Sequence, residues 1–110
     1  MALNVQIQNK GTFVIIAPSG DVDLNVSREF QTHIKKAMES RPQKLIVDLA
    51  GVPYMDSSGV ATLVEAMQIA RKASTRLILC RLQDKVRSIF EIARLDRVFT
   101  IMVSVEAASE

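Results

Sequence analysis

Apolar and polar residues are arranged along the first 18 positions in the way that two short strands require. Residues 3–8 (LNVQIQ) alternate with a period of two, and residues 12–18 (TFVIIAP) form a β-branched and aromatic run. The NKG segment between them supplies residues that favour a tight turn. The pattern predicts an antiparallel hairpin at the start of the chain.

Three later segments repeat their apolar residues every three or four positions, which is the spacing of an amphipathic helix. The first follows a polar loop at residues 19–25 and is expected to be capped by Asn25 or Ser27. The second begins at Gly59 and the third at Asp84. Their apolar faces comprise Phe30, Ile34, Ala37 and Met38, then Val60, Leu63, Val64, Met67 and Ala70, and finally Val86, Ile89, Phe90 and Ala93.

Apolar runs of strand length separate these helices at residues 44–51, 75–82 and 97–103, and residues 104–110 leave room for at most two helical turns. The predicted order is therefore β-β-α-β-α-β-α-β-α. Strands that alternate with helices over short links form βαβ crossovers, so we expect an α/β fold with a mainly parallel sheet and one antiparallel N-terminal strand. Residues 1–110 are expected to form a single domain.

Functional residues of such folds gather in the loops that follow the carboxyl ends of the strands. In this chain those loops are residues 19–25, 50–59, 81–84 and 104–106. We therefore look for a functional site among the polar residues of these four segments.

Composition and charge exclude several classes of function. The chain has 48% hydrophobic and 24% charged residues, as compact globular proteins do. Its net charge is only +2, and the basic residues between Arg71 and Arg97 are interleaved with Asp84, Glu91 and Asp96, which indicates a solvated face and not a nucleic-acid site. The N-terminal residues do not resemble a signal peptide, and no apolar run approaches the ~20 residues of a membrane span. We expect a cytoplasmic protein that binds neither nucleic acid nor a membrane.

Catalytic side chains are scarce. His33 is the only histidine and lies inside the first predicted helix, and the chain lacks the G-x-S-x-G pattern of many serine hydrolases. Cys80, the only cysteine, lies in an apolar run and is expected to be buried. One histidine and one cysteine do not make a zinc site, and Asp21 and Asp23 supply too few oxygens for calcium. We expect no enzymatic activity, no cofactor and no metal.

The segment MDSSGV, residues 55–60, has two interpretations. Asp56, Ser57 or Ser58 could cap the second helix, with Gly59 relaxing the backbone there. A helix N-terminus also suits a phosphate, and a phosphoserine beside Asp56 and near Asp23 would repel a partner protein that covers the loop. The same residues therefore fit a helix cap and a phosphorylation switch.

Three segments together form a recognisable pattern: above all LIVDLAGVPYMDSSGVATL at residues 45–63, with support from SGDVD at 19–23 and ARLDRVFTI at 93–101. In these segments the sequence resembles the STAS domain family, and within it the stand-alone anti-sigma factor antagonists of bacteria. Arg94 is a departure, since many members have glycine there. This departure lies outside the DSSG segment.

The resemblance implies a protein-binding module of STAS type that is switched by phosphorylation. When unphosphorylated, such proteins bind an anti-sigma factor that is also a serine kinase, and thereby release a sigma factor; a serine phosphatase resets the cycle. The acceptor serine of the family falls on Ser57, although local sequence alone leaves Ser58 open. The implied partner-binding residues are Asp21, Asp23, Asp56, Ser57, Ser58 and Gly59.

The resemblance also implies a protein that is monomeric when free. The resemblance leaves one alternative function open, because STAS domains also serve as structural subunits of stress-sensing scaffolds or of lipid-transport ABC complexes. A transporter ATPase as the sole binding partner would favour that alternative.

Overall fold

The computed structural model describes residues 3–110, and within them five strands form one mixed sheet in the order β1-β2-β3-β4-β5. β1 is antiparallel to β2, and the other neighbouring pairs are parallel. This confirms the predicted α/β fold, its antiparallel N-terminal hairpin and the order of its elements. The strands are β1 (Asn4–Asn9), β2 (Phe13–Ser19), β3 (Lys44–Asp48), β4 (Arg76–Cys80) and β5 (Thr100–Met102), and the helices are α1 (Ser27–Met38), α2 (Ser57–Lys72), α3 (Asp84–Ile92), the short 3-10 helix η1 (Leu95–Arg97) and α4 (Val105–Ser109).

The register of the strands divides the apolar side chains between the two faces of the sheet. Ile15 is paired with Ile46, and Ile46 with Ile78, so these three share one face. Residues on either side of them along each strand point to the opposite face and belong to the larger core cluster, among them Val14, Ile16, Leu45, Val47, Leu77 and Leu79.

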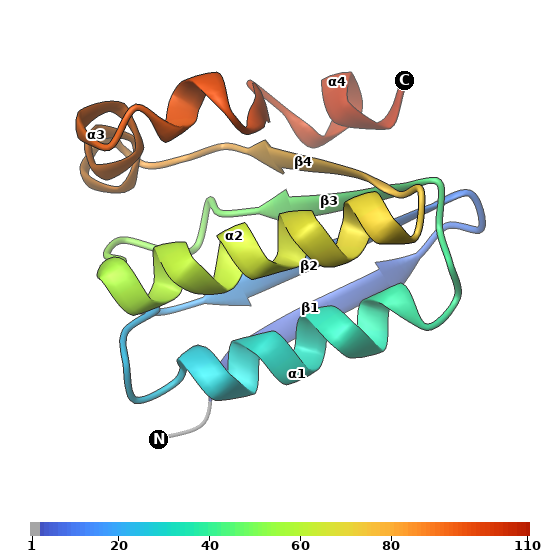
Figure 1. The fold of residues 1–110 in the computed structure, drawn as a ribbon, viewed down its shortest axis with the longest axis horizontal. Coiled ribbons are helices and arrows are strands. Elements are labelled where there is room, and N and C mark those ends of the chain that lie inside the picture. Colours follow the sequence, from blue (N-terminus) through green and yellow to red (C-terminus); the bar gives the residue numbers. More distant parts are fainter. Residues whose placement is uncertain (1–2) are drawn as a thin grey trace.

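Helices α1 and α2 lie side by side along the face of the larger cluster (Figure 1). Helix α3 adds Val86 and Phe90 to this cluster, and the ring of Phe90 meets that of Phe99 edge to face at a centroid distance of 5.5 Å. The fully buried α1 residues Phe30 and Ile34 were predicted from the helical spacing. The main core thus lies between the sheet and three helices.

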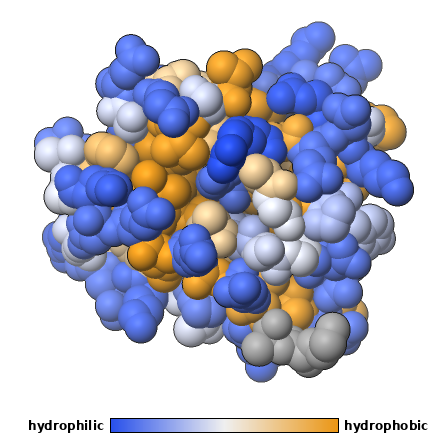
Figure 2. Space-filling view, turned by 180° about the vertical axis from the view of Figure 1, so that it is seen from behind, coloured by the Kyte–Doolittle hydropathy of each residue, from blue (hydrophilic) through white to orange (hydrophobic). Residues whose placement is uncertain are grey.

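The opposite face of the sheet is covered only in part. Ala108 and Val105 of the short helix α4 pack against Ile46 and Ile78 there. Figure 2 views the molecule from behind and shows hydrophobic side chains among hydrophilic ones on this side. Cys80 is buried in this smaller cluster, as predicted, and burial raises the pKa of its thiol to about 11, so it is an unreactive core residue.

Several predicted boundaries are wrong. The last strand is shorter than residues 97–103: Arg97 belongs to the 3-10 helix η1, and Val98, Phe99 and Val103 lie in turns or bends. Ala93 was assigned to the apolar face of α3 but is exposed just after the helix end. Arg94 adopts the left-handed conformation with φ of 58°, which explains why glycine would also suit this position.

The predicted cap of α1 is also wrong. Val26 occupies the N-cap position without a side-chain cap, and it is buried in the core. The amide of Asn25 instead donates to Oδ1 of Asp23 at 3.0 Å, and the Ser27 hydroxyl donates to the Leu24 carbonyl at 3.3 Å. Burial of Val26 therefore decides where this helix begins.

His33 lies on α1, as predicted; it is partly exposed and is 3.9 Å from the carboxylate of Glu29. Between residues 3 and 110, no helix is both long enough and apolar enough to cross a membrane. The same part of the chain contains no group of three or more His, Cys, Asp or Glu side chains that could hold a metal ion.

Candidate functional site

The loops that follow β2 and β3 are joined by hydrogen bonds at the carboxyl edge of the sheet. An isolated parallel bridge pairs Val22 with Met55, and both side chains are fully buried. The Val22 amide donates to the Tyr54 carbonyl at 3.0 Å, and the Asp56 amide donates to the Val22 carbonyl at 3.3 Å. Adjacent strands end here in parallel, so the sequence-distant segments 19–25 and 50–59 meet at one site, as the sequence predicts.

Asp56 is the N-cap of helix α2 and also ties the two loops together. Its Oδ1 accepts hydrogen bonds from the Ser58 amide at 3.0 Å and the Gly59 amide at 3.2 Å, and its Oδ2 accepts one from the Leu24 amide at 3.1 Å. Of the three residues that the sequence offers as caps, the structure thus selects Asp56. Helix α2 begins at Ser57, two residues before the predicted start at Gly59.

These hydrogen bonds favour the charged form of Asp56. The bond from the Ser58 hydroxyl is the largest cause that lowers the pKa of Asp56 below its ordinary value, and amide bonds from Gly59, Leu24 and Ser58 lower it further. Desolvation acts in the opposite direction and is outweighed. The loop therefore carries a negative charge at neutral pH even when neither serine is modified.

The two adjacent serines differ in environment. The Ser58 hydroxyl is partly buried and donates to Oδ1 of Asp56 at 2.6 Å, while the Ser58 carbonyl accepts the Thr62 hydroxyl at 2.9 Å. Ser57, the first residue of α2, is exposed. A modifying enzyme can therefore reach Ser57 without breaking the bond that Ser58 makes to the cap.

Gly59 is needed for space, and the prediction that it relaxes the backbone is wrong. It is buried, and its φ does not lie in the left-handed region that favours glycine. A Cβ atom at this position would lie 2.6 Å from Cγ of Met55 and 2.7 Å from the Val22 carbonyl oxygen. The absence of a side chain lets α2 approach the Val22–Met55 bridge closely.

Exposed acidic and apolar side chains lie in the two loops that meet at this site. Asp21 is exposed and Asp23 partly exposed, and both lie in the loop that is bridged to the Ser57 segment. Leu24 and Tyr54, from the same two loops, expose 74% and 46% of their surface. Sequence reasoning missed these two residues, because a single leucine or tyrosine in a loop has no periodic pattern that would reveal whether it is exposed.

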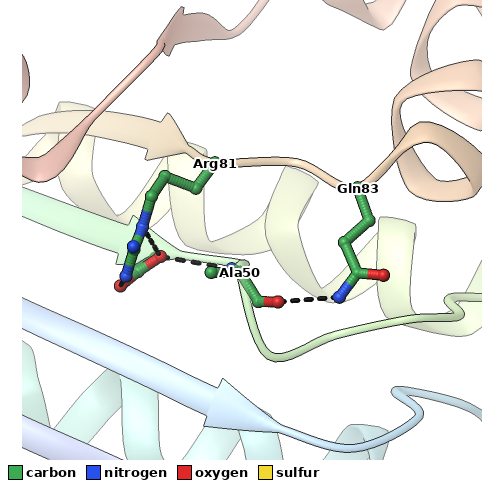
Figure 3. A network of polar contacts seen from close by, with 4 residues as sticks. Ala50, Arg81 and Gln83 are labelled. Atoms are coloured by element: carbon green, nitrogen blue, oxygen red, sulfur yellow. Dashed lines mark hydrogen bonds and ion pairs between the residues drawn. The ribbon is translucent and has the colours of Figure 1, made fainter.

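A second polar network lies at the start of the segment that leads to Ser57 (Figure 3). Asp48 at the end of β3 accepts two hydrogen bonds from Arg81, from Nε at 3.0 Å and from Nη2 at 2.6 Å. Oδ1 of Asp48 also accepts the Ala50 amide at 3.2 Å, and the Gln83 side chain donates to the Ala50 carbonyl at 2.7 Å. The hydrogen bonds that Arg81 donates to Asp48, and then the negative charge of that carboxylate, raise the pKa of Arg81. This network was not predicted.

Comparisons with known proteins agree with this architecture. The family model described as the STAS domain matches residues 4–108. The anti-sigma-B factor antagonist of Listeria monocytogenes is 29% identical over 106 residues, which cover 92% of this chain and 90% of that protein.

Two solved structures have the same fold. An anti-sigma factor antagonist from Mycobacterium paratuberculosis superposes with a TM-score of 0.87 at 17% identity, covering 96% of this chain and 90% of that one. The Bacillus cell fate determinant SpoIIAA in its phosphorylated form superposes with a TM-score of 0.72 at 22% identity, covering 94% and 96%.

Proposed function

The chain belongs to the STAS domain family, and from this premise we propose that it is an anti-sigma factor antagonist whose binding is switched off by phosphorylation of Ser57. In the unphosphorylated state it binds an anti-sigma factor that is also a serine kinase, and so releases a sigma factor. A serine phosphatase that acts on the phosphorylated form restores binding. This cycle takes place in the cytoplasm, and in it the chain itself holds no cofactor, catalyses no reaction and makes no direct contact with nucleic acid or a membrane.

The observation that carries the proposal is the difference between the two serines. Ser57 is exposed, whereas the Ser58 hydroxyl is held by Asp56 at 2.6 Å. A kinase must bring its acceptor hydroxyl into line with the phosphate of ATP, which an exposed residue at the first position of a helix allows. We therefore assign Ser57 as the acceptor and Ser58 as its structural support.

The partner-binding surface comprises the two bridged loops. Asp21, Asp23 and Ser57 contribute exposed or partly exposed polar groups to it, while Asp56, Ser58 and Gly59 fix its shape. A partner that covers this acidic surface would present basic groups to it. The chain is expected to be a monomer when it is free.

Phosphorylation would weaken binding through charge. It adds about −1.5 to −2 charges to a loop in which Asp56 is already ionised and already occupies the amides of Ser58 and Gly59. In the free protein the exposed phosphate stays in water, but a docked partner would have to desolvate it beside another negative charge. A penalty of about 3 kcal/mol would reduce affinity roughly a hundredfold.

The test is phosphorylation by the serine-kinase anti-sigma factors of the chain's own organism, purified and assayed one at a time with Mg²⁺ and ATP. We expect one of them to label Ser57, as mapped by mass spectrometry, and to leave Ser57→Ala unlabelled. The same kinase should bind Ser57→Ala as it binds the unmodified chain, and Ser57→Asp roughly a hundredfold more weakly.

Two results would contradict the proposal. Labelling confined to Ser58 would overturn the assignment of the acceptor. Absence of labelling by every kinase, together with a transporter ATPase as the sole protein that binds the purified chain, would favour the structural-subunit alternative.

A further inference from the structure

We propose that Arg81 is a positioning residue that holds the phosphoacceptor segment in place through Asp48 and Ala50. The inference rests on the proposed function, because it assigns a residue outside the partner-binding surface to the same switch. Arg81 follows β4 and contacts neither serine in the hydrogen-bond network; it acts through residues at the start of the segment that ends at Ser57.

The first step is the attachment of residues 48–50 to the loop after β4. Both oxygens of the Asp48 carboxylate accept a hydrogen bond from Arg81, and the Gln83 side chain donates to the Ala50 carbonyl. Figure 3 shows the Arg81 and Gln83 side chains reaching from one loop to the other at two separate points. Arg81 has a φ of 57°, so its backbone adopts the left-handed conformation. Arg81 and Gln83, which flank Leu82, thus hold Asp48 and Ala50 at two points, and we infer that the two contacts together restrict movement of the Ala50 backbone.

The second step is the path from Ala50 to Ser57. The next residue, Gly51, accepts the Gly20 amide through its carbonyl at 2.9 Å, and Tyr54 accepts the Val22 amide at 3.0 Å. Gly51, Tyr54 and Asp56 are thus hydrogen-bonded to residues 20–24. The residues between β3 and α2 form no regular helix or strand of their own. A displacement at Ala50 would move both loops of the partner-binding surface together.

The third step concerns the charge of Asp48. Only 8% of this residue is exposed, and Arg81 supplies two of its charge-assisted hydrogen bonds. Removal of Arg81 alone would leave a nearly buried carboxylate without its counter-charge and would destabilise the whole fold. Arg81→Met by itself therefore does not distinguish positioning from general stability.

The double variant Asp48→Asn/Arg81→Met makes the distinction. An asparagine oxygen still accepts the Ala50 amide, and no unpaired charge remains, so the urea midpoint should return close to that of the unmodified chain. The contact between Arg81 and Asp48 stays broken, whereas Gln83 still donates to the Ala50 carbonyl. Arg76→Met serves as the matched control, because Arg76 is an exposed arginine at the opposite end of the same strand.

The experiment measures two quantities for each full-length variant: the hydrogen exchange of the Gly20 and Val22 amides by NMR, and kcat/KM for Ser57 phosphorylation by the kinase that labels the unmodified chain. We expect the double variant to show faster exchange at both amides and a kcat/KM that is lower by roughly tenfold, at an unchanged urea midpoint. Arg76→Met should match the unmodified chain in both measurements.

Each other outcome has a defined meaning. A double variant with unchanged kcat/KM overturns the inference, whether or not its amides exchange faster. Lower kcat/KM without faster exchange also overturns it, because Arg81 would then act by touching the kinase. If no kinase labels the unmodified chain, the proposed function fails first and this inference fails with it.

Discussion

The hydroxyl of Ser58 donates to Oδ1 of Asp56 at 2.6 Å, and this contact gives the two adjacent serines different environments. Asp56 uses the same oxygen to accept the Ser58 and Gly59 amides, so one carboxylate atom binds the hydroxyl and caps the helix. Ser57 lies between Asp56 and Ser58 in sequence and is exposed. The proposed modification site and the residue proposed to support it are therefore immediate neighbours.

Replacement of each serine by alanine should have unequal effects on stability. Ser58→Ala removes a short hydrogen bond to an ionised carboxylate and should lower the free energy of unfolding by about 1–2 kcal/mol. Ser57→Ala affects an exposed position and should stay within about 0.5 kcal/mol of the unmodified chain. Urea unfolding monitored by circular dichroism checks both values, and equal losses would contradict the division of roles.

The pH dependence of stability should report the charge of Asp56. Its pKa is lower in the folded state than in the unfolded state, so its contribution to the free energy of unfolding is complete above about pH 5. That contribution decreases as the pH falls below the unfolded-state pKa, and it is lost completely once the pH has fallen through the lower folded-state pKa. Asp56→Asn can still cap the helix but does not titrate.

We therefore expect the unmodified chain to be more stable than Asp56→Asn at pH 7, with the difference decreasing as the pH is lowered from 5 to 2. Urea midpoints of both proteins over this range test the prediction. A difference that is constant with pH would mean that the charge of Asp56 does not stabilise the loop.

The sequence predicts those parts of the fold that depend on short-range periodicity. The β-branched and aromatic run in residues 12–18 identifies β2, and the spacing of Phe30 and Ile34 identifies the buried face of α1. Loops that follow the carboxyl ends of neighbouring parallel strands lie at the same edge of the sheet, and this general rule correctly predicts that the loops of Asp23 and Asp56 meet. Each of these predictions uses residues within one element or a general rule about parallel sheets.

The Asp48–Arg81 ion pair could not be predicted in this way. Its members are 33 residues apart, and their contact depends on the register of β3 against β4 and on the positive φ of Arg81. The start of α1 was missed for a similar reason, because burial of Val26 in the tertiary core outweighs the local capping preference of Asn25 and Ser27. In both cases a long-range contact decides the local structure.

Addition of a single methyl group at Gly59 should disturb the site. In Gly59→Ala the new Cβ would lie 2.6 Å from Cγ of Met55 and 2.7 Å from the backbone oxygen of Val22, so the loop or the helix must move. We expect a loss of about 1–3 kcal/mol in the free energy of unfolding, although alanine is the better helix former. Stability equal to or above that of the unmodified chain, measured by urea unfolding, would contradict the close packing of α2 on the Val22–Met55 bridge.

The exposed leucine of the β2 loop should contribute to partner binding. Leu24 is 74% exposed, and its amide donates to the Asp56 carboxylate, so this leucine belongs to the proposed partner-binding surface. Apolar side chains that become buried next to charged groups are frequent anchors of protein interfaces. Leu24→Ala should weaken binding of the kinase that phosphorylates Ser57 about tenfold, measured by isothermal titration, and should leave the urea midpoint unchanged.

Val103→Ala is the matched control for this prediction. Val103 is 81% exposed and follows β5, which is separated from β2 by β3 and β4, at a spacing of about 5 Å per strand. We expect this variant to bind the kinase as tightly as the unmodified chain. Equal weakening by both substitutions would indicate a nonspecific hydrophobic contribution, whereas no effect of either would place the partner on the acidic side chains of the loops alone.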